Sequence, residues 1–146
     1  HYFFNQSFIT SSHLGWGTTF NSKNKKTLNG AFTAKKHTAK NFDLYDDNIK
    51  SLYKIIALCK KNNINIVYIT TPTDKSYYEN LNKIQIEKTI KTITDLVKNN
   101  SNCYYLNLLN SEKFTNEDFY DADHLNEIGA KKLSLLLDYL VSHQNL

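Results

Sequence analysis

The sequence predicts an α/β fold, in which a parallel sheet carries helices on its faces. Two helical patterns and two short apolar runs rich in β-branched and aromatic residues alternate along the chain, and a further helical pattern ends it. Strands separated by helices of this length are joined by crossovers, which are typical of parallel sheets. Two strands make a small sheet, so we expect the others either within residues 1–41 or outside these 146 residues. The chain would then be an incomplete C-terminal portion of such a domain.

The first regular segment is a helix over about 45–62, followed by a strand. Apolar residues recur along one face of the helix at three- and four-residue steps: Ile49, Leu52, Tyr53, Ile56 and Cys59. Asn62 and Asn63 are suited to the end of a helix. The run Ile64–Ile69 is apolar throughout and is followed by Pro72, which favours a buried parallel strand.

The second half of the chain repeats this alternation. A helix is expected over about 80–98, with one apolar face: Ile86, Ile90, Ile93 and Val97. Cys103–Leu109 is the next predicted strand, and residues 110–125 form a loop. A last helix runs from about 126 to 143 with Asn126 as its N-cap and a buried stripe of apolar residues: Leu133, Leu136, Leu137, Leu140 and Val141.

Residues 1–41 show neither a helical nor a strand period, and we expect them to form an irregular loop or extension. The regular α/β portion is then residues 42–146. The chain contains no Met and begins at His1, so we expect a processed product or a piece of a longer protein.

Composition argues against several classes of function. All 18 basic residues are Lys, spread among acidic residues, so we expect no nucleic-acid partner. No run approaches the roughly 20 apolar residues that span a bilayer. Cys59 and Cys103 are better explained as small buried residues than as a disulfide. The histidines and carboxylates show no metal-ligand spacing, so we expect no metal and no cofactor.

In α/β domains with a parallel sheet, ligand-binding and catalytic sites lie beyond the carboxyl ends of the strands. The stretch Thr70–Asp74 and the 110–125 loop should therefore meet at one edge. Thr71 and Thr73 are candidate substrate-binding residues there, although an ordinary strand-to-helix turn explains them equally well. Trp16 is a third candidate, which could stack on a sugar or acyl group or simply pack into the core.

The chain's most specific feature is an Asp-x-x-His segment before the last helix. The Asp121 carboxylate can accept the Nδ1 proton of His124, which fixes the tautomer and leaves Nε2 as a general base. Leu125 and Ile128 would anchor the turn in the core, and Gly129 would let the helix approach the sheet. The alternative is that Asp121 and His124 are capping or solvated loop residues.

The string Asp-Ala-Asp-His-Leu-Asn-x-x-Gly-Ala, which starts at Asp121, resembles the last block of SGNH (GDSL-like) hydrolases. The resemblance implies a flavodoxin-like three-layer fold, Asp121 as orienting acid and His124 as catalytic base. Asp123 could substitute for Asp121 or tune the site. The implied activity is ester hydrolysis or O-acyl transfer without metal or cofactor, on a small-molecule or carbohydrate ester of the cell envelope, which suggests an extracytoplasmic location.

The chain departs from that family in its nucleophile. It has no Gly-Asp-Ser turn and no Gly-x-Asn-Asp block, and Ser7, Ser11 and Ser12 lack a strand–turn–helix setting. We therefore expect the nucleophile in a missing N-terminal segment before His1 and an inactive isolated chain. Two alternatives stay open, a non-catalytic SGNH-like binding module and a plain α/β domain.

Overall fold

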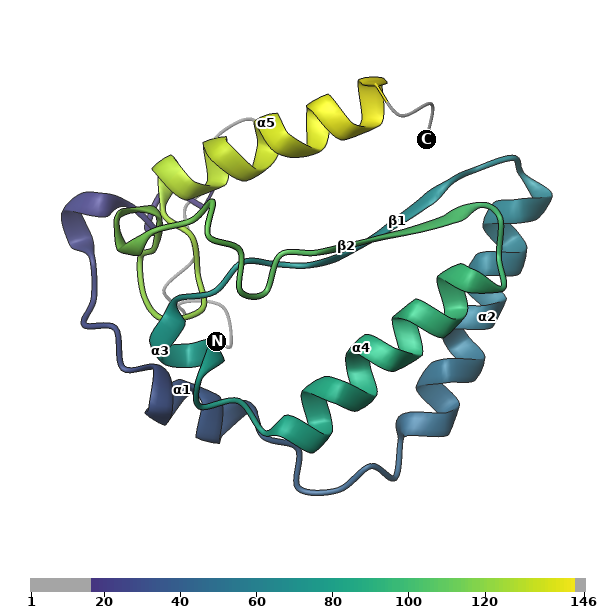
Figure 1. The fold of residues 1–146 in the computed structure, drawn as a ribbon, viewed down its shortest axis with the longest axis horizontal. Coiled ribbons are helices and arrows are strands. Elements are labelled where there is room, and N and C mark those ends of the chain that lie inside the picture. Colours follow the sequence, from purple (N-terminus) through teal and green to yellow (C-terminus); the bar gives the residue numbers. More distant parts are fainter. Residues whose placement is uncertain (1–16, 144–146) are drawn as a thin grey trace, which may run out of the picture.

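The computed structural model describes residues 17–143 (Figure 1). The α5 helix lies on one side of the two strands, and α2 and α4 lie on the other (Figure 1). This arrangement confirms the α/β class with a parallel sheet and flanking helices. The elements follow one another in this order: η1 (Ser22–Asn24), α1 (Gly30–His37), α2 (Tyr45–Lys61), β1 (Ile66–Thr70), α3 (Lys75–Tyr78), α4 (Lys83–Lys98), β2 (Cys103–Asn107), η2 (Asn116–Asp118) and α5 (Glu127–His143).

The β1 and β2 strands pair in parallel, with Ile66 opposite Cys103 and Thr70 opposite Asn107. Within residues 17–143 the sheet contains these two strands only. The β1 strand starts later than expected because Asn63, at φ 55°, closes α2 in the left-handed region that Asn tolerates. The backbone N–H of Ile64 accordingly donates to Cys59 at 2.9 Å, so Ile64 belongs to the helix end.

The α2 and α5 helices agree with their predicted ranges, whereas α4 begins later than predicted. The Asn82 side chain caps α4 by accepting from the N–H of Gln85 at 3.0 Å. A short helix, α3, precedes it and was not expected. The Asp74 carboxylate caps α3 by accepting from the N–H of Ser76 at 2.8 Å. The strand-to-helix turn expected before residue 80 therefore contains a short capped helix of its own.

The expectation that residues 1–41 are irregular is wrong for its second half, which contains η1 and α1. The α1 helix has eight residues, too few to display a repeating apolar period. Its Asn29 cap accepts from the N–H of Phe32 at 3.1 Å. Gly30 lets α1 lie directly on α3, since a Cβ there would sit 2.1 Å from the carbonyl carbon of Ser76. Tertiary packing against α3 thus contributes to holding α1.

The core consists of three small clusters. One lies between α2, α4 and β2, one lies against α5, and one lies between α1, α3 and the loop before α5. Their buried members are, respectively, Ile56, Leu96 and Cys103; Leu108, Phe114 and Phe119; and Ala34, Tyr77 and Ala122. Each cluster joins elements that are far apart in the sequence, so the clusters hold the layers together.

Several residues predicted to be buried are exposed instead. In the run predicted as a buried strand, Ile64 is 52% exposed and Ile69 is 36% exposed. Ile128 is 49% exposed and Val141 is 54% exposed, because only one face of α5 meets the rest of the molecule.

Cys59 and Cys103 are free thiols. Cys103 is buried, as predicted, whereas Cys59 is only partly buried. Among residues 17–143, no helix combines the length and apolar character needed to cross a membrane.

Candidate functional site

The Asp-x-x-His segment forms the tip of a tight loop before α5. Phe119 and Leu125 form an antiparallel bridge across its base. One step further out, the N–H of Tyr120 donates to the carbonyl of His124 at 2.9 Å. The two backbone contacts close the loop, so the positions of Asp121 and His124 are set by the backbone as well as by their side chains.

Backbone hydrogen bonds also attach this loop to the carboxyl edge of the sheet. The N–H of Asp74, just after β1, donates to the carbonyl of Ala122 at 3.1 Å. The N–H of Lys26 donates to the carbonyl of Tyr120 at 2.8 Å. The stretch after β1 and the loop before α5 therefore meet at one edge, as the sequence predicted.

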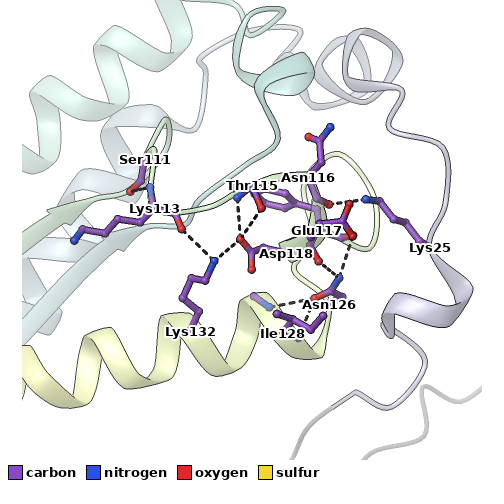
Figure 2. Close-up of polar contacts among 12 residues, drawn as sticks. Lys25, Ser111, Lys113, Thr115, Asn116, Glu117, Asp118, Asn126, Ile128 and Lys132 are labelled. Atoms are coloured by element: carbon purple, nitrogen blue, oxygen red, sulfur yellow. Dashed lines mark hydrogen bonds and ion pairs between the residues drawn. The ribbon is translucent and has the colours of Figure 1, made fainter.

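Asn126 and Asp118 hold the base of the loop (Figure 2). The fully buried Asn126 amide donates to the carbonyl of Glu117 at 2.7 Å, and its oxygen accepts from Ile128 and Gly129 at 2.9 and 3.1 Å. Asn126 is thus the N-cap of α5, as predicted. Gly129 permits a close approach to the loop and not to the sheet, since a Cβ there would lie 2.2 Å from the carbonyl oxygen of Asp118.

The predicted contact between Asp121 and His124 is present. Oδ1 of Asp121 lies 2.8 Å from Nδ1 of His124 and also accepts the backbone N–H of His124 at 2.9 Å. A carboxylate can only accept, so Nδ1 carries the proton and Nε2 of a neutral ring carries the lone pair. Within residues 17–143, Nε2 has no hydrogen-bond partner, and the side chain is 53% exposed. The ring therefore has the tautomer and the accessibility of a general base.

An aromatic ring fixes the imidazole from another side. Phe20 stacks on His124 with ring centroids 5.2 Å apart and an interplanar angle of 22°. Phe20 also meets Tyr120 edge to face at 5.0 Å. His124 is thus oriented by a carboxylate at its Nδ1 and by a ring on its face.

The two aspartates of the loop have opposite pKa shifts. Burial acts to raise the pKa of Asp121, but the hydrogen bond and charge of His124, with the N–H groups of Asp123 and His124, lower it below its usual value. The pKa of Asp123 is raised by burial and by the charge of Asp121, against the attraction of His124 and His37. Asp121 is therefore the more acidic of the two carboxylates beside the imidazole.

Thr71 and Thr73 line a cavity of about 310 Å³ at the carboxyl edge of the sheet. Asp123 also lines it, whereas Asp121 and His124 do not. Asp123 joins the cavity to the Asp–His pair, because its Oδ1 lies 3.3 Å from Nδ1 of His124. The structure thus brings four of the five predicted site residues to one edge of the sheet. The fifth, Trp16, lies outside the described residues.

His37 and Tyr77, which no sequence pattern marked as site residues, border the same cavity. Nδ1 of His37 lies 3.0 Å from the Tyr77 hydroxyl and 3.7 Å from Oδ2 of Asp123. These residues come from α1 and α3, two helices too short for their periods to be recognised. No local pattern in the sequence could have placed them beside Asp123.

The same loop offers a set of metal ligands that the sequence spacing did not indicate. Ligand atoms of Asp121, Asp123 and His124 all lie within 4.8 Å of one another. An ion bound through Nδ1 of His124 would replace the hydrogen bond between this nitrogen and Asp121. A chelator tests for such an ion.

The sequence profile of the family described as "Protein of unknown function (DUF1574)" matches residues 10–131. The chain belongs to this family, and the matched region includes the loop with Asp121 and His124. No curated protein and no solved structure matches the chain.

Proposed function

We propose that this chain supplies the acid–base pair of an SGNH-like serine esterase or O-acyltransferase, in a domain of that three-layer fold. The observation that carries the proposal is the 2.8 Å contact between Oδ1 of Asp121 and Nδ1 of His124. This contact holds the imidazole in the tautomer that leaves Nε2 unprotonated and accessible. A base that activates a hydroxyl nucleophile requires both properties.

In this mechanism, Nε2 of His124 accepts the proton of a serine hydroxyl as that oxygen attacks the ester carbonyl. The Asp121 carboxylate stabilises the resulting imidazolium. His124 then returns the proton to the leaving alcohol. The serine lies outside residues 17–143, and the resemblance to SGNH hydrolases supports an ester-linked acyl group, possibly on envelope carbohydrate, as the substrate.

The test is covalent labelling and ester hydrolysis by the full-length protein. We expect a fluorophosphonate probe to label one serine and the protein to hydrolyse p-nitrophenyl acetate. His124→Ala should lower kcat/KM by about 10⁴–10⁶-fold, and Asp121→Asn by a smaller factor of about 10²–10⁴, because it spares the base but loses its orientation.

His143→Ala is the matched control, because this histidine lies on α5 and, among residues 17–143, its side chain meets the carbonyl and the ring of Tyr139. It should leave both readouts unchanged. Loss of activity in EDTA would favour a metal on Asp121, Asp123 and His124 and would contradict the serine mechanism. A full-length protein that is neither labelled nor active would favour the alternative, a non-catalytic SGNH-like binding module.

A further inference from the structure

The cavity beside the Asp–His pair has a distinctive lining. It lies beyond the carboxyl end of β1, between α1 and α4. Fourteen of the described residues line it. Five of them are threonines and two are amides, so hydroxyl and amide groups predominate.

Charge is nearly absent from this lining. The sequence contains 18 Lys, yet none is among the described residues that line the cavity. Asp123 is the one carboxylate among the described lining residues. A ligand with phosphate or carboxylate groups would find no Lys among the described lining residues to offset the loss of its hydration, and it would lie near the Asp123 carboxylate, so the lining disfavours anions.

Several polar groups in the cavity can bond a ligand. The hydroxyl of Thr71 has no hydrogen-bond partner within residues 17–143. The hydroxyl of Thr73 donates to the carbonyl of Leu109 at 3.0 Å and keeps its lone pairs as acceptors. The Asp123 carboxylate adds a strong acceptor for hydroxyl donors. The cavity therefore offers both donors and acceptors, as a ligand with several hydroxyls requires.

The rest of the lining is apolar and firmly held. Leu81, Ile86 and Leu109 supply aliphatic surface for the C–H face of a ligand. The Gln85 side chain ties α4 to the end of α1, accepting from the N–H of Ala39 at 2.7 Å and donating to the carbonyl of His37 at 3.2 Å. At about 310 Å³, the cavity is at the small end of the range for ligand sites.

We propose that this cavity binds an uncharged, hydroxyl-rich ligand of about the size of one sugar ring. The identification of this ligand as the alcohol part of an ester rests on the proposed function. In that role Asp123 is a specificity-determining residue, because it accepts a ligand hydroxyl on the cavity side and faces His124 on the other. The binding site itself requires no nucleophile.

The test is calorimetric titration of the full-length protein with three kinds of sugar. These are the neutral methyl glycosides of common hexoses, the cationic sugar glucosamine and the anionic sugar glucuronic acid. We expect at least one neutral glycoside to bind, and glucuronic acid to bind at least tenfold more weakly. Thr71→Val and Asp123→Asn should each weaken binding of the neutral glycoside by about 5–30-fold, since each removes or weakens one ligand hydrogen bond.

Thr94→Val is the matched control, because Thr94 lies on α4 but is exposed and outside the cavity. It should bind like the wild type. Glucuronic acid binding as tightly as the neutral glycosides, binding unaffected by either cavity substitution, or no binding by any neutral glycoside would each overturn the proposal. His124→Ala separates the two proposals: it should abolish hydrolysis and retain glycoside binding.

Discussion

At the scale of single residues, the surroundings of a carboxylate decide its role. Asp121 and Asp123 are two positions apart, and burial is the largest single influence on the pKa of both. The hydrogen bonds and charge of His124, with the N–H groups of the loop, nevertheless bring the pKa of Asp121 below its usual value, whereas the pKa of Asp123 stays raised. The first is suited to hold an imidazolium, and the second faces the cavity. A third carboxylate, Asp118, supports the loop that carries both, and its contribution can be measured.

Asp118 should stabilise the fold at neutral pH and lose that effect in acid. Its side chain is 2% exposed and accepts from Nζ of Lys132 at 2.6 Å and from the N–H of Thr115 at 2.8 Å (Figure 2). Burial acts to raise its pKa, but these hydrogen bonds and the Lys132 charge lower it below the ordinary value. A carboxylate with a lowered folded-state pKa stabilises above its unfolded pKa of about 3.9, and the effect fades as pH falls through the folded value.

We therefore expect Asp118→Asn to lower the free energy of unfolding at pH 7 by roughly 1–3 kcal/mol. The difference from wild type should shrink as pH falls below about 4. Urea unfolding at pH 7, 5 and 3 measures it. Asp95→Asn is the control, because its pair with Lys91 is exposed on both sides and should contribute little. A pH-independent difference for Asp118→Asn would contradict the assignment.

The sequence predicted those contacts of the site that join residues close together along the chain. Asp121 and His124 are three positions apart in one loop, so their contact follows from the chain's own geometry. His37 and Tyr77 reach Asp123 only through the packing of α1 on α3. Contacts of that kind depend on tertiary structure, which a periodic pattern does not encode.

At the scale of elements, the length of a helix decided whether the sequence pattern predicted it. The α2 and α5 helices have 17 residues each, enough for an apolar face to repeat. The α3 helix has four residues and depends on its Asp74 cap. The missed elements are therefore those held by caps and by close packing at single residues such as Gly30.

The cap of α5 should be worth more than an ordinary cap. In Asn126→Ala, α5 loses its N-cap, at about 1 kcal/mol, and the carbonyls of Glu117 and Phe119 lose a buried donor, at about 1–3 kcal/mol. We expect a total loss of roughly 2–4 kcal/mol in the free energy of unfolding. The exposed Asn82 caps α4 through one such bond, so Asn82→Ala should cost only about 1 kcal/mol.

Chemical denaturation of both variants checks this comparison. Asn126→Asp adds a second test, because it keeps the capping oxygen and loses the amide donor. Its stability should fall between those of wild type and Asn126→Ala. Equal losses for Asn126→Ala and Asn82→Ala would mean that the contacts of the buried amide contribute nothing beyond the cap.

At the scale of the whole molecule, the two-stranded sheet leaves much apolar surface uncovered in the described structure. The α2 helix shows this clearly: Ile56 is 2% exposed, whereas its neighbours Ile55 and Leu58 are 50% and 62% exposed. Parallel sheets are normally buried on both faces. The exposed apolar surface therefore supports the proposal that this chain is part of a larger three-layer domain.

The stability of the layered arrangement should depend on Ile56 and hardly on Ile55. Ile56 packs with Leu96 and Cys103 in the cluster that joins α2, α4 and β2. Ile56→Ala should therefore lower the free energy of unfolding of this chain by about 2–5 kcal/mol, the usual cost of such a cavity. Ile55→Ala, which has the same change in side chain at an exposed position, should change it by less than about 0.5 kcal/mol. Urea unfolding measures both, and similar losses in the two variants would show that α2 buries a different face from the one described.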